Sequence, residues 1–235
     1  MKQINLNDAS PRRKFLQTLA TGTAALGIAS VVSPFQQLQA SPVNTVNDND
    51  PDPDEFFNKL KGKHKIVFDT TEPHGIFPFA WPKVFMLTNA ATGTPQKECN
   101  AVVVLRHNAI PYAFPDEMWA KYNLGQVFKI DDPKTTKPSV RNPFYKPGAD
   151  DFKVPGLGSV PLGISDLQAN GVAFCVCNMA ITVYSAAVAD QMKLKAEDVK
   201  NDWTSSILPG IQLVPSGVWA VGRAQEHGCG YCFVG

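Results

Sequence analysis

The sequence predicts an α/β fold in which helices cover both faces of a mostly parallel, five-stranded sheet. Short apolar segments alternate with helical segments five times along residues 63–235, and this alternation is typical of parallel strands joined by crossover helices. The apolar segments are nearly continuous, as expected for strands that are buried on both faces. The sequence holds no glycine-rich phosphate-binding motif, so it does not support a nucleotide site.

The first 40 residues are expected to form an export signal that is absent from the mature protein. Arg12 and Arg13 precede Phe15, and no charged residue occurs between Phe15 and Asn47. This pattern resembles the twin-arginine motif, which implies passage through the twin-arginine translocase, cleavage after Ala40 and a periplasmic location. The neutral stretch is too rich in polar residues for a good membrane anchor. An uncleaved anchor or a disordered tail is the alternative.

The mature chain is long enough for one domain. Removing residues 1–40 leaves 195 residues with a net charge of about −2. Binding to a phosphate backbone requires clustered lysines and arginines, so nucleic acid is not an expected partner. Residues 41–62 begin with an acidic, proline-containing stretch and are expected to be a flexible lead-in. The α/β domain is therefore expected to span residues 63–235.

The first half of that domain is predicted to contain two strands and two helices. Residues 64–69 and 100–105 are apolar runs of strand length. Residues 79–91 have helical character, with Pro82 in the first turn, where a proline is tolerated. A short helix is expected over residues 116–122.

Residues 131–163 are predicted to be an insertion or lid. The segment holds six prolines and no sustained hydrophobic period. A loop this long inside a compact domain usually has a functional or interface role. We therefore expect it to cover the binding crevice or to pack between subunits.

The second half is predicted to supply the remaining strands and helices. The strands are expected at residues 172–177, 211–214 and 231–234. Two of the helices are expected at residues 180–192 and 196–203. Ser165 is expected to cap a short helix that Gly171 ends, and Ser216 to cap the last helix, which runs to His227.

Several of these pieces, in their order, resemble the DsrE/DsrF-like family. The matching segments are residues 64–69, 102–107, 167–178, 208–218 and 225–231, which together cover most of residues 63–235 apart from the insertion. The resemblance implies a flavodoxin-like three-layer fold, assembly into trimers or larger rings, and a cysteine that carries sulfur as a persulfide in a sulfur relay. Cys177 matches that cysteine, and His107 matches a family histidine that is followed by Gly rather than by Asn108. The sulfur-relay members are cytoplasmic, so their substrate is not carried over to an exported protein.

Cys177 is the first candidate for a reactive group. The carboxyl ends of parallel strands meet at one edge of the sheet, where polar residues from several strands are expected to gather: Thr70, Thr71, Glu72, His74, Arg106, His107, Asn178 and Ser216. A helix beginning near Ala180 and the imidazole of His107 would lower the pKa of the Cys177 thiol. Cys175 lies on the same face of the strand and is a candidate resolving thiol. A buried structural thiol is the alternative for both cysteines.

The C-terminal segment from His227 to Cys232 holds a second candidate site. Cys229 and Cys232 form a Cys-x-x-Cys pair beside His227, which is typical of redox or metal sites. Together with Cys175 and Cys177 they would supply enough ligands for copper, zinc or an iron–sulfur cluster. A structural disulfide between Cys229 and Cys232 is the alternative. The preceding helix should return the chain to the edge of the sheet away from Cys177, unless a neighbouring subunit closes the gap.

Three functions are compatible with the sequence. The first is a periplasmic thiol or persulfide protein in which Cys177 carries sulfur or acts as a redox thiol, with a redox or sulfur-relay protein as partner. The second is a metal- or cofactor-binding protein that is not itself an enzyme. The third is a ligand-binding or assembly protein whose cysteines only stabilise the fold.

Overall fold

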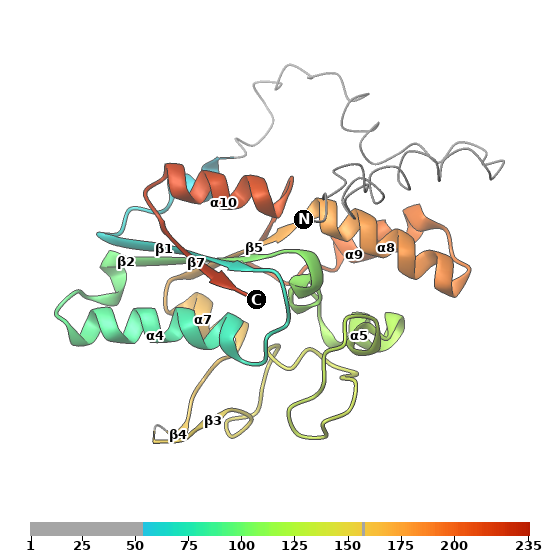
Figure 1. Cartoon of the computed structure of the whole chain (residues 1–235), viewed down its shortest axis with the longest axis horizontal. Helices are drawn as coiled ribbons and strands as arrows, with labels where there is room; N and C mark the ends of the chain where they lie inside the picture. The colour runs from blue at the N-terminus through green and yellow to red at the C-terminus, as the bar shows by residue number, and fades with distance from the viewer. Residues whose placement is uncertain (1–53, 157) are drawn as a thin grey trace, which may run out of the picture. The chain divides into compact units, whose positions relative to one another are not determined.

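Five parallel strands form the central sheet of the protein (Figure 1). The computed structural model describes residues 54–156 and 158–235, so the predicted export signal lies outside the described residues. The strands lie in the order β6-β5-β2-β1-β7, and every neighbouring pair is parallel. Their bounds are β1 (His64–Thr70), β2 (Cys99–Leu105), β5 (Val172–Cys177), β6 (Ile211–Val214) and β7 (Gly230–Val234). All five predicted strands are confirmed, with ends that differ from the prediction by one residue or less.

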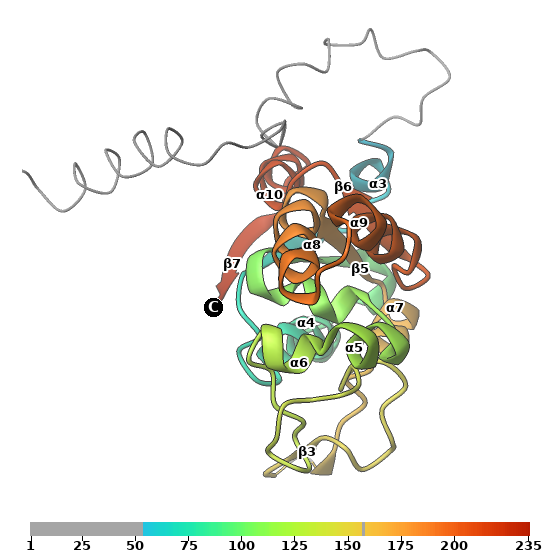
Figure 2. The same cartoon turned by 90° about the vertical axis from the view of Figure 1, so that its right-hand side faces the viewer.

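Helices cover both faces of this sheet, which confirms the predicted three-layer α/β architecture. On one face lie α4 (Phe77–Ala91) and α7 (Ile164–Ala169), and on the other lies α10 (Gly217–Glu226) (Figures 1 and 2). Each face has its own apolar core, one around Phe79, Val103 and Phe174 and one beneath α10. No helix in the described part of the chain is long and apolar enough to cross a membrane.

The strand order explains why α10 lies opposite α4. The connections from β1 to β2, from β2 to β5 and from β5 to β6 all step in one direction across the sheet. The last connection returns from β6 to the far edge, where β7 pairs with β1. Right-handed crossovers that step in opposite directions place their helices on opposite faces. In chain order the sheet is thus 4-3-2-1-5, which differs from the 2-1-3-4-5 order of flavodoxin itself.

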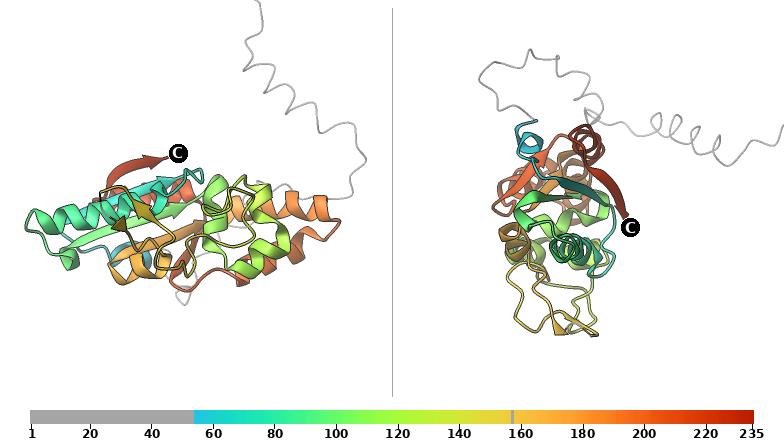
Figure 3. Two further views of the ribbon diagram at one scale, coloured as in Figure 1. Left: turned by 90° about the horizontal axis from the view of Figure 1, so that it is seen from below. Right: turned by 90° about the vertical axis from the view of Figure 1, so that its left-hand side faces the viewer.

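Helices at the carboxyl end of the sheet complete the fold. Figure 3 shows α8 and α9 extending beyond that end of the strands. The helical segments there are η2 (His107–Ala113), α5 (Asp116–Tyr122), α6 (Leu124–Val127), α8 (Asn178–Met192) and α9 (Ala196–Ser205). A short 3-10 turn, η1 (Gln96–Glu98), precedes β2 at the other end. The predicted helix at residues 116–122 is confirmed without change.

Two expectations about helix starts are wrong. Because α4 begins at Phe77, Pro82 is its sixth residue and lies inside the helix, while Pro78 occupies the first turn. Pro82 therefore removes one intrahelical hydrogen bond instead of falling among the free donors of the first turn. Ser165 lies within α7 and does not cap it, since the N-cap residue is Gly163. The predicted cap at Ser216 is confirmed, because its Oγ accepts a hydrogen bond from the backbone N–H of Trp219.

The end of the predicted flexible lead-in belongs to the fold. Residues of α3 (Glu55–Asn58) form a short helix, and Phe57 is completely buried. Phe57 and Leu60 join the core beneath α10, where the Phe57 ring packs edge-on against Trp219. The acidic composition that is broken by prolines ends before Phe56, where the apolar residues that join the fold begin.

The insertion is an ordered segment whose apolar residues belong to the domain core. It contains the antiparallel pair β3 (Lys153–Val154) and β4 (Gly158–Ser159), which lies below the sheet in Figure 1. The ring of Phe144 stacks on Phe79 of α4, with ring centroids 3.8 Å apart. Phe144 and Phe152 therefore bury the aromatic face of α4, and the insertion is expected to unfold together with the domain.

Asn142 fastens the insertion to the rest of the domain. Its side-chain amide donates to the backbone oxygens of Tyr112 and Phe114 at 2.9 and 2.8 Å, and its Oδ1 accepts from the N–H of Phe144 at 3.0 Å. All of these groups are buried, so removing the side chain would leave three backbone groups without partners. The Asn142 side chain therefore joins the insertion to the end of η2 through two of these buried hydrogen bonds and holds Phe144 through the third.

The variant Asn142→Ala is expected to lower the free energy of unfolding by about 3 kcal/mol, because buried backbone groups that lose their partners are costly. Urea denaturation of the two proteins measures this difference. Val140→Ala is the matched control, since Val140 lies two residues away and is 72% exposed. Equal stability of Asn142→Ala and the control would contradict the fastening role.

Candidate thiol site

An open pocket of about 320 Å³ lies at the carboxyl ends of β2, β5 and β6. Four residues from the predicted set line it: Arg106, His107, Cys177 and Ser216. Leu105 pairs with Val176 in the sheet, so Arg106 and Cys177 leave neighbouring strands at the same level. The remaining wall is mostly apolar and comes from the first turns of α8 and α10, through Met179, Ala180, Val183, Tyr184, Gly217 and Val218.

Cys177 occupies the N-cap position of α8. Its Sγ accepts a hydrogen bond from the backbone N–H of Ala180 at 3.3 Å. The residue is 6% exposed and lines the pocket. A helix N-terminus carries partial positive charge, so the first turn of α8 directs a positive potential at the Cys177 sulfur. The predicted placement of Cys177 just before a helix is therefore confirmed, with α8 beginning at Asn178.

An ion pair between Arg106 and the buried Asp69 lies beside the pocket. The Nε and Nη2 of Arg106 donate to the two carboxylate oxygens of Asp69 at 2.5 and 2.9 Å. The hydroxyl of Tyr231 donates to the same carboxylate at 2.9 Å. The hydrogen bond to Asp69 is the main cause that raises the pKa of Arg106, and burial of the guanidinium partly opposes it. Because Arg106 and Cys177 line the same pocket, the Cys177 sulfur shares that pocket with a permanently charged side chain.

The backbone of α10 approaches Arg106 so closely that only glycine fits at Gly217. A Cβ atom at Gly217 would lie 2.5 Å from Cβ and 2.7 Å from Cδ of Arg106. The aliphatic part of Arg106 therefore packs directly against the first turn of α10. This contact sets the side-chain position of Arg106 from one side while Asp69 sets it from the other.

His107 lies in the pocket wall, and its ring hydrogen-bonds to Glu72. Its Nδ1 is 3.1 Å from Oε1 of Glu72, and its backbone has a positive φ of 52°. Asn108 donates to both carboxylate oxygens of Glu72 and accepts from the hydroxyl of Tyr184 at 2.6 Å. Within the described chain no hydrogen bond joins His107 to Cys177. His107 and Cys177 therefore line the same pocket, while the His107 ring is hydrogen-bonded to Glu72.

Cys175 does not fit the predicted role of resolving thiol. Its side chain is fully buried in the core beneath α10, and burial raises the pKa of the thiol. A neutral thiol without access to solvent is a poor nucleophile. The alternative interpretation, a small core residue, is the one that agrees with the structure. Cys99 is also buried, in the core on the α4 face.

The structure does not bring His227, Cys229 and Cys232 into one ligand set. Cys229 is buried beneath α10, whereas Cys232 packs against the core on the other face of the sheet. The two thiols point apart because they are three positions apart along an extended chain. All five cysteines fall in the described ranges and are free, so the alternative disulfide between Cys229 and Cys232 is absent. Groups of three or more metal-ligating side chains are likewise not found among residues 54–156 and 158–235.

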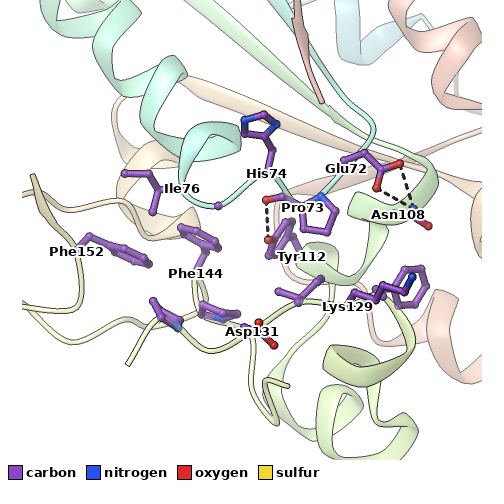
Figure 4. Close-up of a pocket in the computed structure, with 15 residues that line it drawn as sticks. Glu72, Pro73, His74, Ile76, Asn108, Tyr112, Lys129, Asp131, Phe144 and Phe152 are labelled. Atoms are coloured by element: carbon purple, nitrogen blue, oxygen red, sulfur yellow. Dashed lines mark hydrogen bonds between the residues drawn. The ribbon is translucent and has the colours of Figure 1, made fainter. Parts of the chain in front are cut away.

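A second and larger cavity of about 550 Å³ lies beneath the insertion (Figure 4). Glu72 and His74 of the predicted polar set line this cavity, whereas Thr70, Thr71 and Asn178 line neither of the two pockets. The insertion lines this cavity and not the Cys177 pocket.

Three residues important to the thiol site were missed: Asp69, Gly217 and Tyr231. A signal for Asp69 and Arg106 was present, because charged residues directly end two apolar strands. Tyr231 and Gly217 carry no comparable signal, since their roles depend on how β7 and α10 return to the sheet.

The variant Gly217→Ala is expected to lower the free energy of unfolding by about 1–3 kcal/mol, because an added methyl group clashes with the stem of Arg106. Gly222→Ala, in the same helix, is the matched control, since an added Cβ there meets no atom within 4 Å. The control is expected to be more stable than the natural protein by about 0.5–1 kcal/mol. Denaturant titration checks both values, and a stabilised Gly217→Ala would show that the close contact is unimportant.

Comparisons with known proteins do not assign this chain to a family. No family model matches the sequence, and no curated protein matches it. Among solved structures, it is similar to a protein of unknown function from Methanobacterium thermoautotrophicum, at 14% identity and a TM-score of 0.38, over 73% of this chain and 100% of that chain. A likeness this weak carries no functional argument, and the fold is established by the arrangement of the chain's own elements.

Proposed function

We propose that this protein is an exported thiol protein of the DsrE/DsrF-like kind that carries sulfur on Cys177. The observation that supports it is the position of Cys177, which combines an α8 N-cap, an open pocket and a neighbouring guanidinium. Periplasmic location is part of the proposal and is supported by Arg12 and Arg13 ahead of a neutral stretch.

The proposed reaction is an exchange of sulfur that needs no external oxidant or reductant. The thiolate of Cys177 attacks the outer sulfur of a persulfide donor, R–S–SH. The bond between the two donor sulfurs breaks, its electron pair leaves with R–S⁻, and Cys177 becomes Cys177–S–SH. The thiolate of an acceptor then takes the outer sulfur by the same kind of exchange, which restores the Cys177 thiolate.

Positive electrostatic potential at the pocket supports this chemistry. The Nη1 of Arg106 has no hydrogen-bond partner among the described residues, while Nε and Nη2 are held by Asp69. The first turn of α10, capped by Ser216, lines the same pocket as the first turn of α8. Two helix N-termini and one guanidinium therefore place positive potential around the pocket.

The pocket rim supports a protein as donor or acceptor. Val183 of α8 and Val218 of α10 line the pocket and are 52% and 70% exposed. Exposed apolar side chains on both sides of a reactive group are typical of a surface that contacts another protein. A sulfur-relay partner, or a further copy of this chain in a trimer or larger ring, is the partner that we propose.

Incubating the folded protein with cysteine persulfide is expected to add the mass of one sulfur atom to the peptide that contains Cys177. Peptide mass spectrometry after rapid alkylation locates the added atom. The variant Cys177→Ser should take up no sulfur at this peptide, because the nucleophile is gone. Arg106→Leu is expected to slow the uptake by about tenfold, which corresponds to about 1.4 kcal/mol of lost charge stabilisation.

Cys232→Ser serves as the control, because Cys232 lies outside the pocket and is partly exposed. Its rate of sulfur uptake at Cys177 should equal that of the natural protein. Uptake at Cys232 alone, or a rate at Cys177 no faster than that of free cysteine, would refute the proposed function.

A further inference from the structure

The cavity beneath the insertion has a polar end and, on the opposite side, an apolar end. Figure 4 shows Ile76, Phe144 and Phe152 on one side, and Glu72 and Lys129 on the other. Its volume of about 550 Å³ lies within the range of roughly 300–1,000 Å³ that is typical of small-molecule sites. The cavity therefore has the size and the division of surface that an amphipathic small molecule requires.

The apolar end is rigid. Phe144 and Phe152 stack with their rings 4.8 Å apart and almost parallel, and Phe144 also stacks on Phe79. The insertion that carries the two rings is fixed by the buried hydrogen bonds of Asn142. A flat apolar group entering here meets a preformed wall, so little ordering cost opposes its binding.

The polar end presents both signs of charge. Lys129 is exposed and has no ion-pair partner among the residues described, and the side chain of Glu72 is 43% exposed even though Asn108 and His107 contact it. Asp131 adds a second carboxylate to the lining (Figure 4). A ligand with a single charge would attract one of these groups and repel the other. An ammonium and a carboxylate attached to one carbon atom would satisfy both signs of charge.

We propose that this cavity binds a small zwitterionic molecule with a flat apolar body, of the class of the large apolar α-amino acids. The ammonium group lies at Glu72, the carboxylate at Lys129, and the apolar side chain against Phe144 and Ile76. The site is distinct from the Cys177 pocket, which shares none of its lining residues.

Isothermal titration calorimetry with three probes that share a phenyl ring tests this assignment. The probes are L-phenylalanine, 2-phenylethylamine and 3-phenylpropionate, which carry two charges, the ammonium alone and the carboxylate alone. L-phenylalanine is expected to bind at least about tenfold more tightly than either of the others, because each lacks one charge partner. Equal affinity for all three probes, or no saturable binding of L-phenylalanine, would overturn the proposal.

Variants connect the binding to the cavity. Lys129→Gln is expected to weaken L-phenylalanine binding by about tenfold and not to weaken 2-phenylethylamine binding, because only the carboxylate loses its partner. Lys137→Gln, on the insertion but outside the cavity lining, is the control and should change neither. Unchanged binding of L-phenylalanine to Lys129→Gln would overturn the assignment. Cys177→Ser should bind like the natural protein, and Lys129→Gln should still take up sulfur, so each proposal can fail alone.

Discussion

The buried ion pair between Asp69 and Arg106 is the interaction on which the carboxyl edge of the sheet depends. It joins the ends of the two central strands β1 and β2, and through Tyr231 it also holds the edge strand β7. Asp69 is buried, so removing Arg106 would leave a buried carboxylate without its charge partner, which costs about 3–5 kcal/mol in comparable cases. The same ion pair therefore stabilises the carboxyl edge of the sheet and positions the charge of Arg106 at the thiol pocket.

The same ion pair also fixes the orientation of the Arg106 guanidinium. Two of its nitrogens are held by Asp69, and its stem is pressed against Gly217, so the guanidinium has little freedom left. A charge that is already fixed needs no reorganisation when an anion forms beside it. Cys177 obtains this neighbour without a direct hydrogen bond, since its sulfur accepts from the first turn of α8.

The sequence was sufficient for the five strands and for the position of Cys177, but not for the starts of α4 and α7. Continuous apolar runs located all five strands, and the position of Cys177 at a strand end placed it at the N-cap of a helix. The sequence was insufficient for the C-terminal segment, because the position at which β7 starts decides which face of the sheet each cysteine side chain joins. Cys229 and Cys232 look like a pair in the sequence, yet the alternation along the extended chain sends them to opposite cores. The cavity beneath the insertion depends on long-range stacking of Phe144 on Phe79, for which no local pattern exists.

The proposed sulfur transfer requires that reagents reach the Cys177 thiol through the pocket, while the Cys175 thiol stays enclosed in the core. Treating the folded protein with iodoacetamide and locating the label by peptide mass spectrometry measures this directly. The account predicts that Cys177 is alkylated in the native protein and that Cys175 is alkylated only after unfolding. A folded protein in which Cys177 stays unlabelled, or in which both thiols react together, would contradict it.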